Sequence, residues 1–383
     1  MKILHLSNVI GEKKGGGVHE VVSNAYRCQK LLNHEPHIWH PGSNEDADSI
    51  RMDANIKALP TYGNPKYGII KDLFKPISKN FHIKSFDIIH QHGIWMPMSL
   101  YSQKIRRKTK IKSVVQVHGY LGSYKLNIKK HIAFNFYEKS NLLNADALVA
   151  CSMNEAQDLK NIFPQKEIAI VPNGVSSDFF NAISLKTHKL KKKKRMLFIS
   201  QITPIKGLER FFKVLAKMGD KKFIDWEIQI AGYGDENYTK VLKELVIKLN
   251  LSDLISFIGS KFGIDKLDVL DNSEILVLPS YNENYGIVVA EALARGIPVL
   301  TTKGTPWQEL NTHSCGFWVD NDSNGLATGL FKILETTELE LFEMGKRGRE
   351  LVKRKYIWNK TILNTIEIYK WVINGGVKPD FFI

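Results

Sequence analysis

The chain has 383 residues, of which 43% are hydrophobic and 10% aromatic, and its formal net charge is +15 with a pI of about 9.4. The length allows two domains of ordinary size, and the composition is that of a globular protein. No stretch approaches the roughly 18 consecutive apolar residues of a membrane span, and the N-terminal MKILHLSN has no signal-peptide pattern, so a cytoplasmic protein is expected.

The basic charge predicts an anionic partner of one of three kinds: nucleic acid, an anionic membrane surface or an anionic substrate. The sequence contains no helix-turn-helix, zinc-finger or aromatic RNA-binding signature, so no nucleic-acid partner is expected. The three cysteines, Cys28, Cys151 and Cys315, lack metal-ligand spacing and are expected to be reduced.

The first half of the chain alternates strand-like and helix-like segments. Strands are expected at 2–6, 37–40, 86–90, 113–117, 147–150 and 168–171, and helices at 18–32, 98–107 and 129–143. Residues 43–85 are less regular and rich in turn-forming residues, which indicates an insertion. The alternation predicts a mainly parallel sheet with helices on both faces.

A basic segment, KTHKLKKKKR at 186–195, ends this half and predicts an exposed linker. Further strands are expected at 196–200, 227–231, 255–258, 274–278, 298–301 and 317–319, and an amphipathic helix at 358–373. The pattern predicts two doubly wound α/β domains, 1–185 and 195–357. In such pairs ligands bind at the carboxyl ends of the strands, in the cleft where the domains face one another.

Three glycines, Gly15, Gly16 and Gly17, follow the first expected strand. They predict a loop whose backbone amides approach a ligand closely, with a surface turn as the alternative. Dinucleotide-binding proteins share a glycine run at this place. The glycine spacing of dehydrogenases is absent, however, and the next strand ends in HIWH without an acidic residue.

Histidines end two strands of the first half. The segment HQHGIW contains His90, His92 and Trp95, and VHGY places His118 before a glycine. An imidazole at a strand end either contacts a substrate or is a structural hydrogen-bonding group, and an ordinary pKa near 6.5 lets it act in either protonation state. Metal binding by the cluster stays open, although no carboxylate accompanies it at ligand spacing.

The expected strand at 274–278 is followed by a polar loop and an apolar helix. Glu283 lies in the loop, and Glu291 lies inside the helix, eight positions later. A helix start exposes backbone N–H groups and the positive end of the helix dipole, both of which favour phosphate. A carboxylate on so apolar a helix needs hydrogen-bond partners, which are either sugar hydroxyls or a neighbouring loop.

This segment, YNENYGIVVAEALARG, closely resembles the E-x7-E motif of retaining GT-B glycosyltransferases. The resemblance is to family 4, or group 1, which includes mannosyl- and glucosyltransferases of polysaccharide and lipopolysaccharide synthesis. Other segments resemble the family in the same order: PNGV at 172–175, KG at 206–207, AGYGD at 231–235, GSKF at 259–262 and TPWQEL at 305–310. These matches span residue 1 to about 356. The resemblance implies two Rossmann-like domains, with the final helix, 358–383, crossing back to the first.

The resemblance also implies roles for individual residues. Glu283 would contact hydroxyls of the donor sugar, Glu291 the ribose, and His118 the reacting sugar. The other donor-site candidates contact phosphate, base or sugar: Gly16, Gly17, Gln201, Lys206, Gly232, Lys261, Asn284, Tyr285 and Gly286. His92, Trp95 and Asn173 are expected on the acceptor side, and His90 is expected to be structural. No protein nucleophile, metal or cofactor is expected besides a nucleotide-diphosphate sugar.

One position departs from the family pattern. Family members usually carry R-x4-KG, in which the arginine and lysine clamp the donor diphosphate, but this chain has Gln201 before Lys206. A neutral amide cannot replace the forked, charged guanidinium. The alternatives are compensation by Lys261 or Arg210, a weaker donor affinity, or an inactive protein.

The expected function is a retaining transfer of a hexose-type sugar to a saccharide or lipid-linked saccharide in bacterial surface polysaccharide or lipopolysaccharide synthesis. Rival hypotheses are a nucleotide-sugar epimerase or phosphorylase of the same architecture, and a non-catalytic sugar-nucleotide-binding protein. The basic runs at 104–112 and 125–130, with interleaved apolar residues, predict docking on the inner face of an anionic membrane, with a solvated helix face as the alternative. The sequence does not indicate the oligomeric state.

Overall fold

The structure is a computed structural model that describes residues 1–8, 12–42, 53–63, 68–73, 82–95, 97–121, 128–181 and 193–383. The chain forms two units. Unit 1 comprises Met1–Gly174 together with Trp358–Ile383, and unit 2 comprises Val175–Ile357. The predicted return of the chain end to the first unit agrees with this division, and each unit is described by itself.

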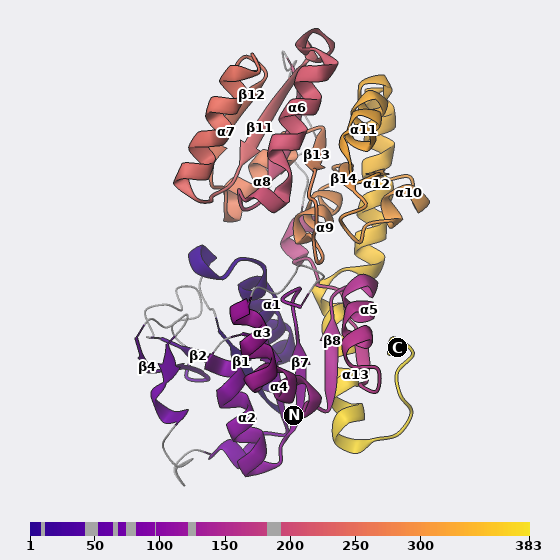
Figure 1. The fold of residues 1–383 in the computed structure, drawn as a ribbon. Coiled ribbons are helices and arrows are strands. Elements are labelled where there is room, and N and C mark those ends of the chain that lie inside the picture. The colour runs from indigo at the N-terminus through magenta and orange to yellow at the C-terminus, as the bar shows by residue number, and fades with distance from the viewer. Residues whose placement is uncertain are drawn as a thin grey trace. The chain divides into compact units, whose positions relative to one another are not determined.

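Unit 1 contains a seven-stranded sheet in the order β3-β2-β1-β6-β7-β8-β9, in which every strand pairing is parallel (Figure 1). Its strands are β1 (Lys2–Ser7), β2 (Glu35–Pro41), β3 (Ile56–Leu59), β6 (Ile88–His92), β7 (Lys112–Gln116), β8 (Ala147–Ala150) and β9 (Ile168–Ile170). A short antiparallel pair, β4 (Thr61–Tyr62) and β5 (Ile69–Ile70), lies apart from this sheet.

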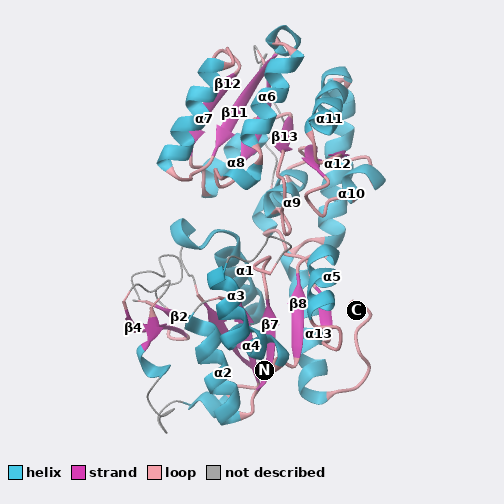
Figure 2. Ribbon diagram, in the orientation of Figure 1, coloured by secondary structure: helices cyan, strands magenta, loops and turns pink. Residues whose placement is uncertain are grey.

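Helices cover both faces of the unit 1 sheet, as Figure 2 shows. They are α1 (Glu12–Leu31), α2 (Pro97–Thr109), α3 (Ile128–Ala133), α4 (Lys139–Leu143), α5 (Met153–Ile162) and α13 (Trp358–Asn374). Alternation along each strand sends Ile3 and Ile88 to the face under α1 and α13, and Leu4 and Ile89 to the face under α2. Both faces are therefore covered, so that the polar side chains of these strands, among them His5, His90 and Gln91, are buried together with the apolar ones.

Unit 2 contains a six-stranded parallel sheet in the order β12-β11-β10-β13-β14-β15. Its strands are β10 (Lys194–Ile199), β11 (Trp226–Ala231), β12 (Ile255–Gly259), β13 (Ile275–Leu278), β14 (Val299–Thr302) and β15 (Gly316–Val319). Its helices are α6 (Leu208–Met218), α7 (Glu236–Lys248), α8 (Gly263–Asp271), α9 (Ile287–Ala294), α10 (Glu309–Thr312), α11 (Ser323–Glu335) and α12 (Glu338–Lys355).

The first unit boundary lies earlier than the predicted linker. Val175 already belongs to unit 2, because it pairs with Ile357 and its amide donates to the Tyr356 carbonyl oxygen at 2.7 Å. Two arginines, Arg295 and Arg349, then hold the backbone at 179–181 through their guanidinium groups. Residues 186–192 of the predicted linker lie outside the described residues, and β10 begins at Lys194, before the predicted Met196.

Two predicted elements differ from the structure. The prediction of a glycine loop is wrong, because Gly15, Gly16 and Gly17 lie inside α1, which begins at Glu12. The single helix predicted at 129–143 is three segments, since a π-helical turn at Phe134–Glu138 separates α3 from α4. Within the described ranges, no helix is both long and apolar enough to span a bilayer.

Candidate active site

The centre of the unit 2 sheet is a topological switch point, where β10 and β13 are neighbours. From β10 the chain proceeds to β11 on one side, and from β13 it proceeds to β14 on the other. In open α/β sheets, ligands bind beyond the carboxyl ends of the strands at this point. The loop after β10 carries Lys206, and the loop after β13 carries Glu283.

Lys206 and Glu283 form an ion pair through the lysine Nζ and the carboxylate Oε2. Their side chains are only 14% and 17% exposed, and the Ser280 hydroxyl lies 3.4 Å from the same carboxylate oxygen. The sequence predicted both residues at a donor site, and the structure brings them into direct contact. A cation and an anion so placed can hold phosphate and sugar hydroxyls respectively.

A glycine turn brings Lys206 to the end of β13. Gly207 has a φ of 72°, and a Cβ atom there would lie 2.2 Å from the Pro279 carbonyl oxygen. The Tyr281 amide donates to the Ile205 carbonyl oxygen at 2.8 Å, which fastens the two loops together. Only glycine fits this position, because a side chain would meet backbone at a left-handed φ.

Glu291 is the second carboxylate of the motif, and it lies within α9 with its side chain only 3% exposed. Its Oε1 accepts from Lys266 Nζ of α8 at 2.6 Å. Glu291 therefore pairs with a neighbouring helix, where the structural alternative expected a loop. The ribose contact stays a prediction, in which hydroxyl groups would share the carboxylate with Lys266. The sequence did not identify Lys266, since α8 carries no motif.

The loop before α9 is held by buried aromatic side chains. The Trp307 indole N–H donates to the Tyr285 carbonyl oxygen at 2.5 Å, and the Tyr285 ring packs against Trp307 and Tyr356. The Tyr285 side chain is thus part of the core and not a donor contact. The residues on either side of Tyr285 are not part of this core. Asn284 is half-buried, and Gly286, with a φ of 73°, is the N-cap of α9. Trp307 sets the path of this loop.

Gln201, in the position of the family's arginine, is exposed just after β10. Arg210, one of the two candidates for compensation, is already engaged by the protein. Its guanidinium donates to the carbonyl oxygens of Pro279 and Asn321 at 2.9 and 2.8 Å and stacks 4.0 Å from the Tyr281 ring centroid. These contacts fix Arg210 within the loop framework, so we expect no compensation from this residue.

Two other donor-site candidates lie beyond the ends of β11 and β12. A Cβ atom at Gly232 would lie 2.0 Å from the Ser200 carbonyl oxygen, and the Gly232 amide already donates to the Gly259 carbonyl oxygen at 2.9 Å. Gly232 therefore serves the close packing of the loops. Lys261 is half-buried, and compensation by Lys261 for the missing arginine charge stays a prediction.

In unit 1, His118 follows β7 in a strained backbone conformation, with a φ of 56°. The next amide, of Gly119, donates to the Glu155 carboxylate, whose other oxygen accepts from the Cys151 amide at 2.6 Å. A left-handed φ at a non-glycine residue persists where surrounding contacts impose it, and it is frequent at functional sites. Here Glu155 holds the amide that directly follows His118.

Half-buried His118 ends a chain of imidazoles whose other members are buried. His92 Nδ1 lies 3.3 Å from His118 Nε2, His92 Nε2 lies 2.9 Å from His5 Nδ1, and His5 Nε2 lies 2.7 Å from Gln29 Oε1. His5 and His92 are 0% and 1% exposed. His92 is therefore buried against other histidines, which replaces its predicted contact with an acceptor.

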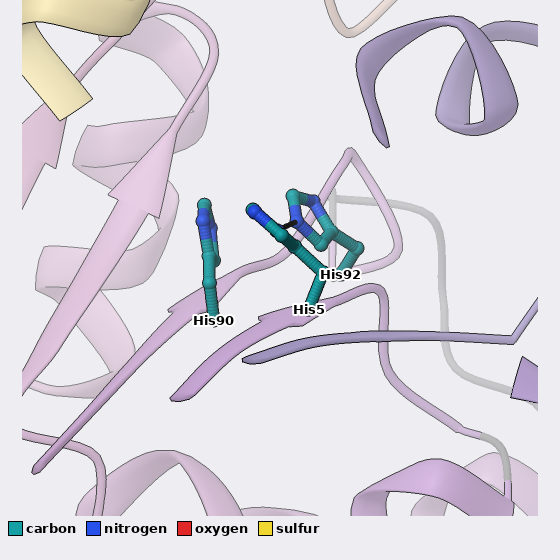
Figure 3. Close-up of side chains that lie close together, drawn as sticks. All are labelled: His5, His90 and His92. Carbon is teal, nitrogen blue, oxygen red and sulfur yellow. Dashed lines mark hydrogen bonds between the residues drawn. The ribbon is translucent and has the colours of Figure 1, made fainter. Parts of the chain in front are cut away.

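His90 lies beside His5 and His92, and the three rings form a cluster, as Figure 3 shows. His90 Nδ1 lies 2.5 Å from the Tyr369 hydroxyl of α13, in agreement with the expected structural role. Burial lowers the pKa of His5 to about 4 and that of His118 to about 3, and it lowers the pKa values of His90 and His92 well below 6.5. His118 is thus a neutral hydrogen-bonding group at physiological pH. The sequence alone allowed it both protonation states, because an unperturbed imidazole has a pKa near 6.5.

The remaining acceptor-side candidates are held by unit 1. The Trp95 indole N–H donates to the Tyr120 carbonyl oxygen at 2.9 Å, and Asn173 is 9% exposed with its Oδ1 3.5 Å from Cys151 Sγ. These contacts brace two loops, and an acceptor contact stays a prediction. Gly16 and Gly17 lie in the second turn of α1, where helical hydrogen bonding uses the amides, so they do not form the expected phosphate loop.

Two family models match consecutive parts of the chain. The model described as Glycosyltransferase Family 4 matches residues 15–179, and the model described as Glycosyl transferases group 1 matches residues 180–351. The chain is 24% identical over 325 residues to the O-antigen biosynthesis glycosyltransferase WclY of Escherichia coli, a match that covers 82% of this chain and 84% of that protein.

Two solved structures resemble the fold over nearly the whole chain. Sucrose-phosphate synthase of Thermosynechococcus elongatus has a TM-score of 0.77 at 19% identity, with 98% of this chain and 100% of that chain covered. HepE of Anabaena, solved in complex with UDP and glucose, has a TM-score of 0.75 at 14% identity, with 96% and 99% covered. Both likenesses concern the fold.

Proposed function

We infer the function of this chain from its family: it belongs to the group 1, family 4 glycosyltransferases of the GT-B fold. Within this family we propose a retaining enzyme that transfers a hexose-type sugar from a nucleoside diphosphate to a saccharide or lipid-linked saccharide. The observation that carries the proposal is the ion pair of Lys206 and Glu283 at the switch point of unit 2.

Unit 2 supplies the groups that a sugar nucleotide needs. The diphosphate binds the Lys206 ammonium and the backbone amides around Asn284–Gly286 at the start of α9, where the helix dipole is positive. These groups stabilise the negative charge that grows on the leaving nucleoside diphosphate as the glycosidic bond breaks. With this positive charge supplied by the protein, the diphosphate needs no metal ion.

Two carboxylates then orient the sugars of the donor. Glu283 accepts hydroxyls of the transferred hexose, and Glu291 accepts hydroxyls of the ribose beside Lys266. The leaving phosphate takes the proton of the acceptor hydroxyl, so no protein nucleophile is required. On unit 1, neutral His118 hydrogen-bonds the transferred sugar.

A role in surface polysaccharide synthesis is supported by relatives. WclY is named for O-antigen biosynthesis, and a further relative is a 41.2 kDa protein of the cps region of Klebsiella pneumoniae, 21% identical over 97% of this chain. The structural relative HepE was solved with UDP, so UDP-sugars are the first donors to examine.

Incubation with a panel of nucleotide sugars tests the proposal. We expect one donor to release its nucleoside diphosphate in slow hydrolysis, and His118→Ala to lower this release. A glycosylated product formed with the same donor would show the retained anomeric configuration by NMR. Binding of a nucleotide sugar without any release would favour the non-catalytic alternative, and conversion to an epimer would favour the epimerase.

The glutamine at the family's arginine position predicts a weak donor contact. We expect Gln201→Arg to lower the KM for the donor by about tenfold, because a charge-assisted bond to phosphate contributes about 1.5–3 kcal/mol. Steady-state kinetics with the identified donor measures this. Lys261→Ala is the companion variant: a raised donor KM in that variant identifies Lys261 as the compensating cation, whereas an unchanged KM in both variants contradicts a phosphate at this position.

Docking on an anionic membrane is proposed for unit 1. Ile132 and Phe136 are 65% and 83% exposed beside the exposed Lys130, whereas Arg106 of the first basic run is buried against Asn141. Part of the second run, 125–127, lies outside the described residues. We expect flotation with vesicles that contain anionic lipid, and its loss at high salt and in Phe136→Ala. Absence of flotation at every salt concentration would favour a solvated helix face.

A further inference from the structure

Three histidines of unit 1 form a cluster that the transferase chemistry does not use. His5, His90 and His92 each offer one ring nitrogen, and these nitrogens all lie within 4.8 Å of one another (Figure 3). The cluster follows from register, since His5 of β1 pairs with His90 of β6 and Ser7 pairs with His92. Alternation along both parallel strands therefore sends all three rings to the face under α1 and α13.

Hydrogen bonds on the outer side of each ring fix which nitrogen faces inward. Gln29 Oε1 accepts from His5 Nε2 at 2.7 Å, which leaves the lone pair on His5 Nδ1. When His90 Nδ1 donates to the Tyr369 hydroxyl at 2.5 Å, the lone pair lies on His90 Nε2. Histidine ligands of metals are usually held by such outer partners, which fix tautomer and ring orientation.

Of the three nitrogens that face inward, one has no hydrogen-bond partner among the described residues and the other two face each other. His90 Nε2 is buried and has no hydrogen-bond partner in the described structure. His92 Nε2 and His5 Nδ1 lie 2.9 Å apart, a separation that either a shared proton or a common metal ion explains. Two imidazoles bound to one tetrahedral ion at about 2.0–2.1 Å have nitrogens roughly 3.3 Å apart, close to this distance.

We propose that His5 Nδ1, His90 Nε2 and His92 Nε2 bind a late first-row transition-metal ion, of which Zn²⁺ is the one we expect. Imidazole ligands select zinc, copper, cobalt or nickel over magnesium and calcium, which prefer oxygen. Three histidines leave the fourth tetrahedral position for water. His92 Nδ1 faces His118 Nε2 at 3.3 Å, so the ion also positions the His118 ring.

This site is separate from the donor site, and the prediction that the diphosphate needs no metal is unaffected. The ion joins β1 to β6 and, through Gln29 and Tyr369, adds contacts from α1 and α13. It therefore stabilises the strand ends from which the loops of unit 1 arise. The sequence left metal binding open for His90, His92 and His118 while no metal was expected, and it missed His5.

Metal content and cobalt spectroscopy test the proposal with tag-free protein. We expect about one zinc per chain as purified, removal by a strong chelator, and one equivalent of Co²⁺ to restore intense tetrahedral d–d absorption that Zn²⁺ abolishes. We also expect zinc, but not Mg²⁺, to raise the Tm of the chelated protein. Protein that contains no metal as purified and gives only the weak spectrum of aqueous cobalt would overturn the proposal.

Variants locate the ion. His90→Gln should abolish cobalt absorption, and Tyr369→Phe, which removes only the outer hydroxyl, should weaken zinc affinity about 10- to 100-fold. The control is His131→Gln, at an exposed histidine of the same unit, with unchanged binding expected. If His90→Gln does not fold, Tyr369→Phe decides: zinc affinity equal to that of wild type would place the ion elsewhere and overturn the assignment.

Discussion

Replacement of Lys206 by alanine is expected to lower kcat/KM for the sugar nucleotide by about two to three orders of magnitude. Its ammonium is the charged partner of Glu283 at the switch point of unit 2, and the position five residues earlier holds the neutral Gln201. Loss of Lys206 thus removes the main side-chain cation for the leaving diphosphate. Initial rates over a range of donor concentrations measure the effect.

The chain offers a matched control for this change. Lys346 and Glu343 form an exposed pair at 2.6 Å on α12, far along the chain from the motif. Lys346→Ala should leave both kcat and KM unchanged. If Lys206→Ala kept wild-type kcat/KM, the diphosphate would bind elsewhere and the site assignment would be wrong.

Replacement of Glu283 by glutamine should lower kcat by about a hundredfold, with a smaller change in donor KM. Hydrogen bonds to a charged group contribute about 1.5–3 kcal/mol, and those that strengthen as the glycosidic bond breaks affect kcat. The variant keeps the size of the side chain but loses the charge that pairs with Lys206. Single-turnover rates separate the chemical step from binding.

Glu343→Gln is the control for this prediction, because it neutralises an exposed carboxylate that also pairs with a lysine. Circular dichroism and Tm should be close to wild type for both variants. A Glu283→Gln enzyme with normal kcat and a raised KM would show that the carboxylate only binds the ground state.

The sheets of both units were predictable because buried parallel strands are short apolar runs separated by helices. The six strands expected in unit 2 all occur, with ends that shift by a few residues. The three consecutive glycines Gly15–Gly17 predicted a loop, but they lie in a helix. Each glycine disfavours a helix by about 1 kcal/mol, but packing of Val21, Val22 and Ala25 continues α1 through them.

The candidate site was predictable only where one segment carries the chemistry. Glu283, Lys206 and Gly286 follow strand ends that sequence patterns locate. Lys266 and His5 were missed, because their roles depend on which elements become neighbours. A signal for His5 existed: it shares the alternation of Ile3 and Ser7 in β1, and β1 adjoins the histidine strand β6.

The return of the chain at Trp358 gives unit 1 an unusual order of completion. Trp358, Ile366 and Tyr369 of α13 join the core against Ile3 and Ile88, and the backbone of Ile383 donates to the Ile168 carbonyl oxygen at 2.9 Å. During synthesis, residues 1–174 emerge from the ribosome long before α13, which covers this face, is made. One face of the first sheet therefore stays partly bare while the whole of unit 2 is synthesised, so the unit that begins first is the last to close.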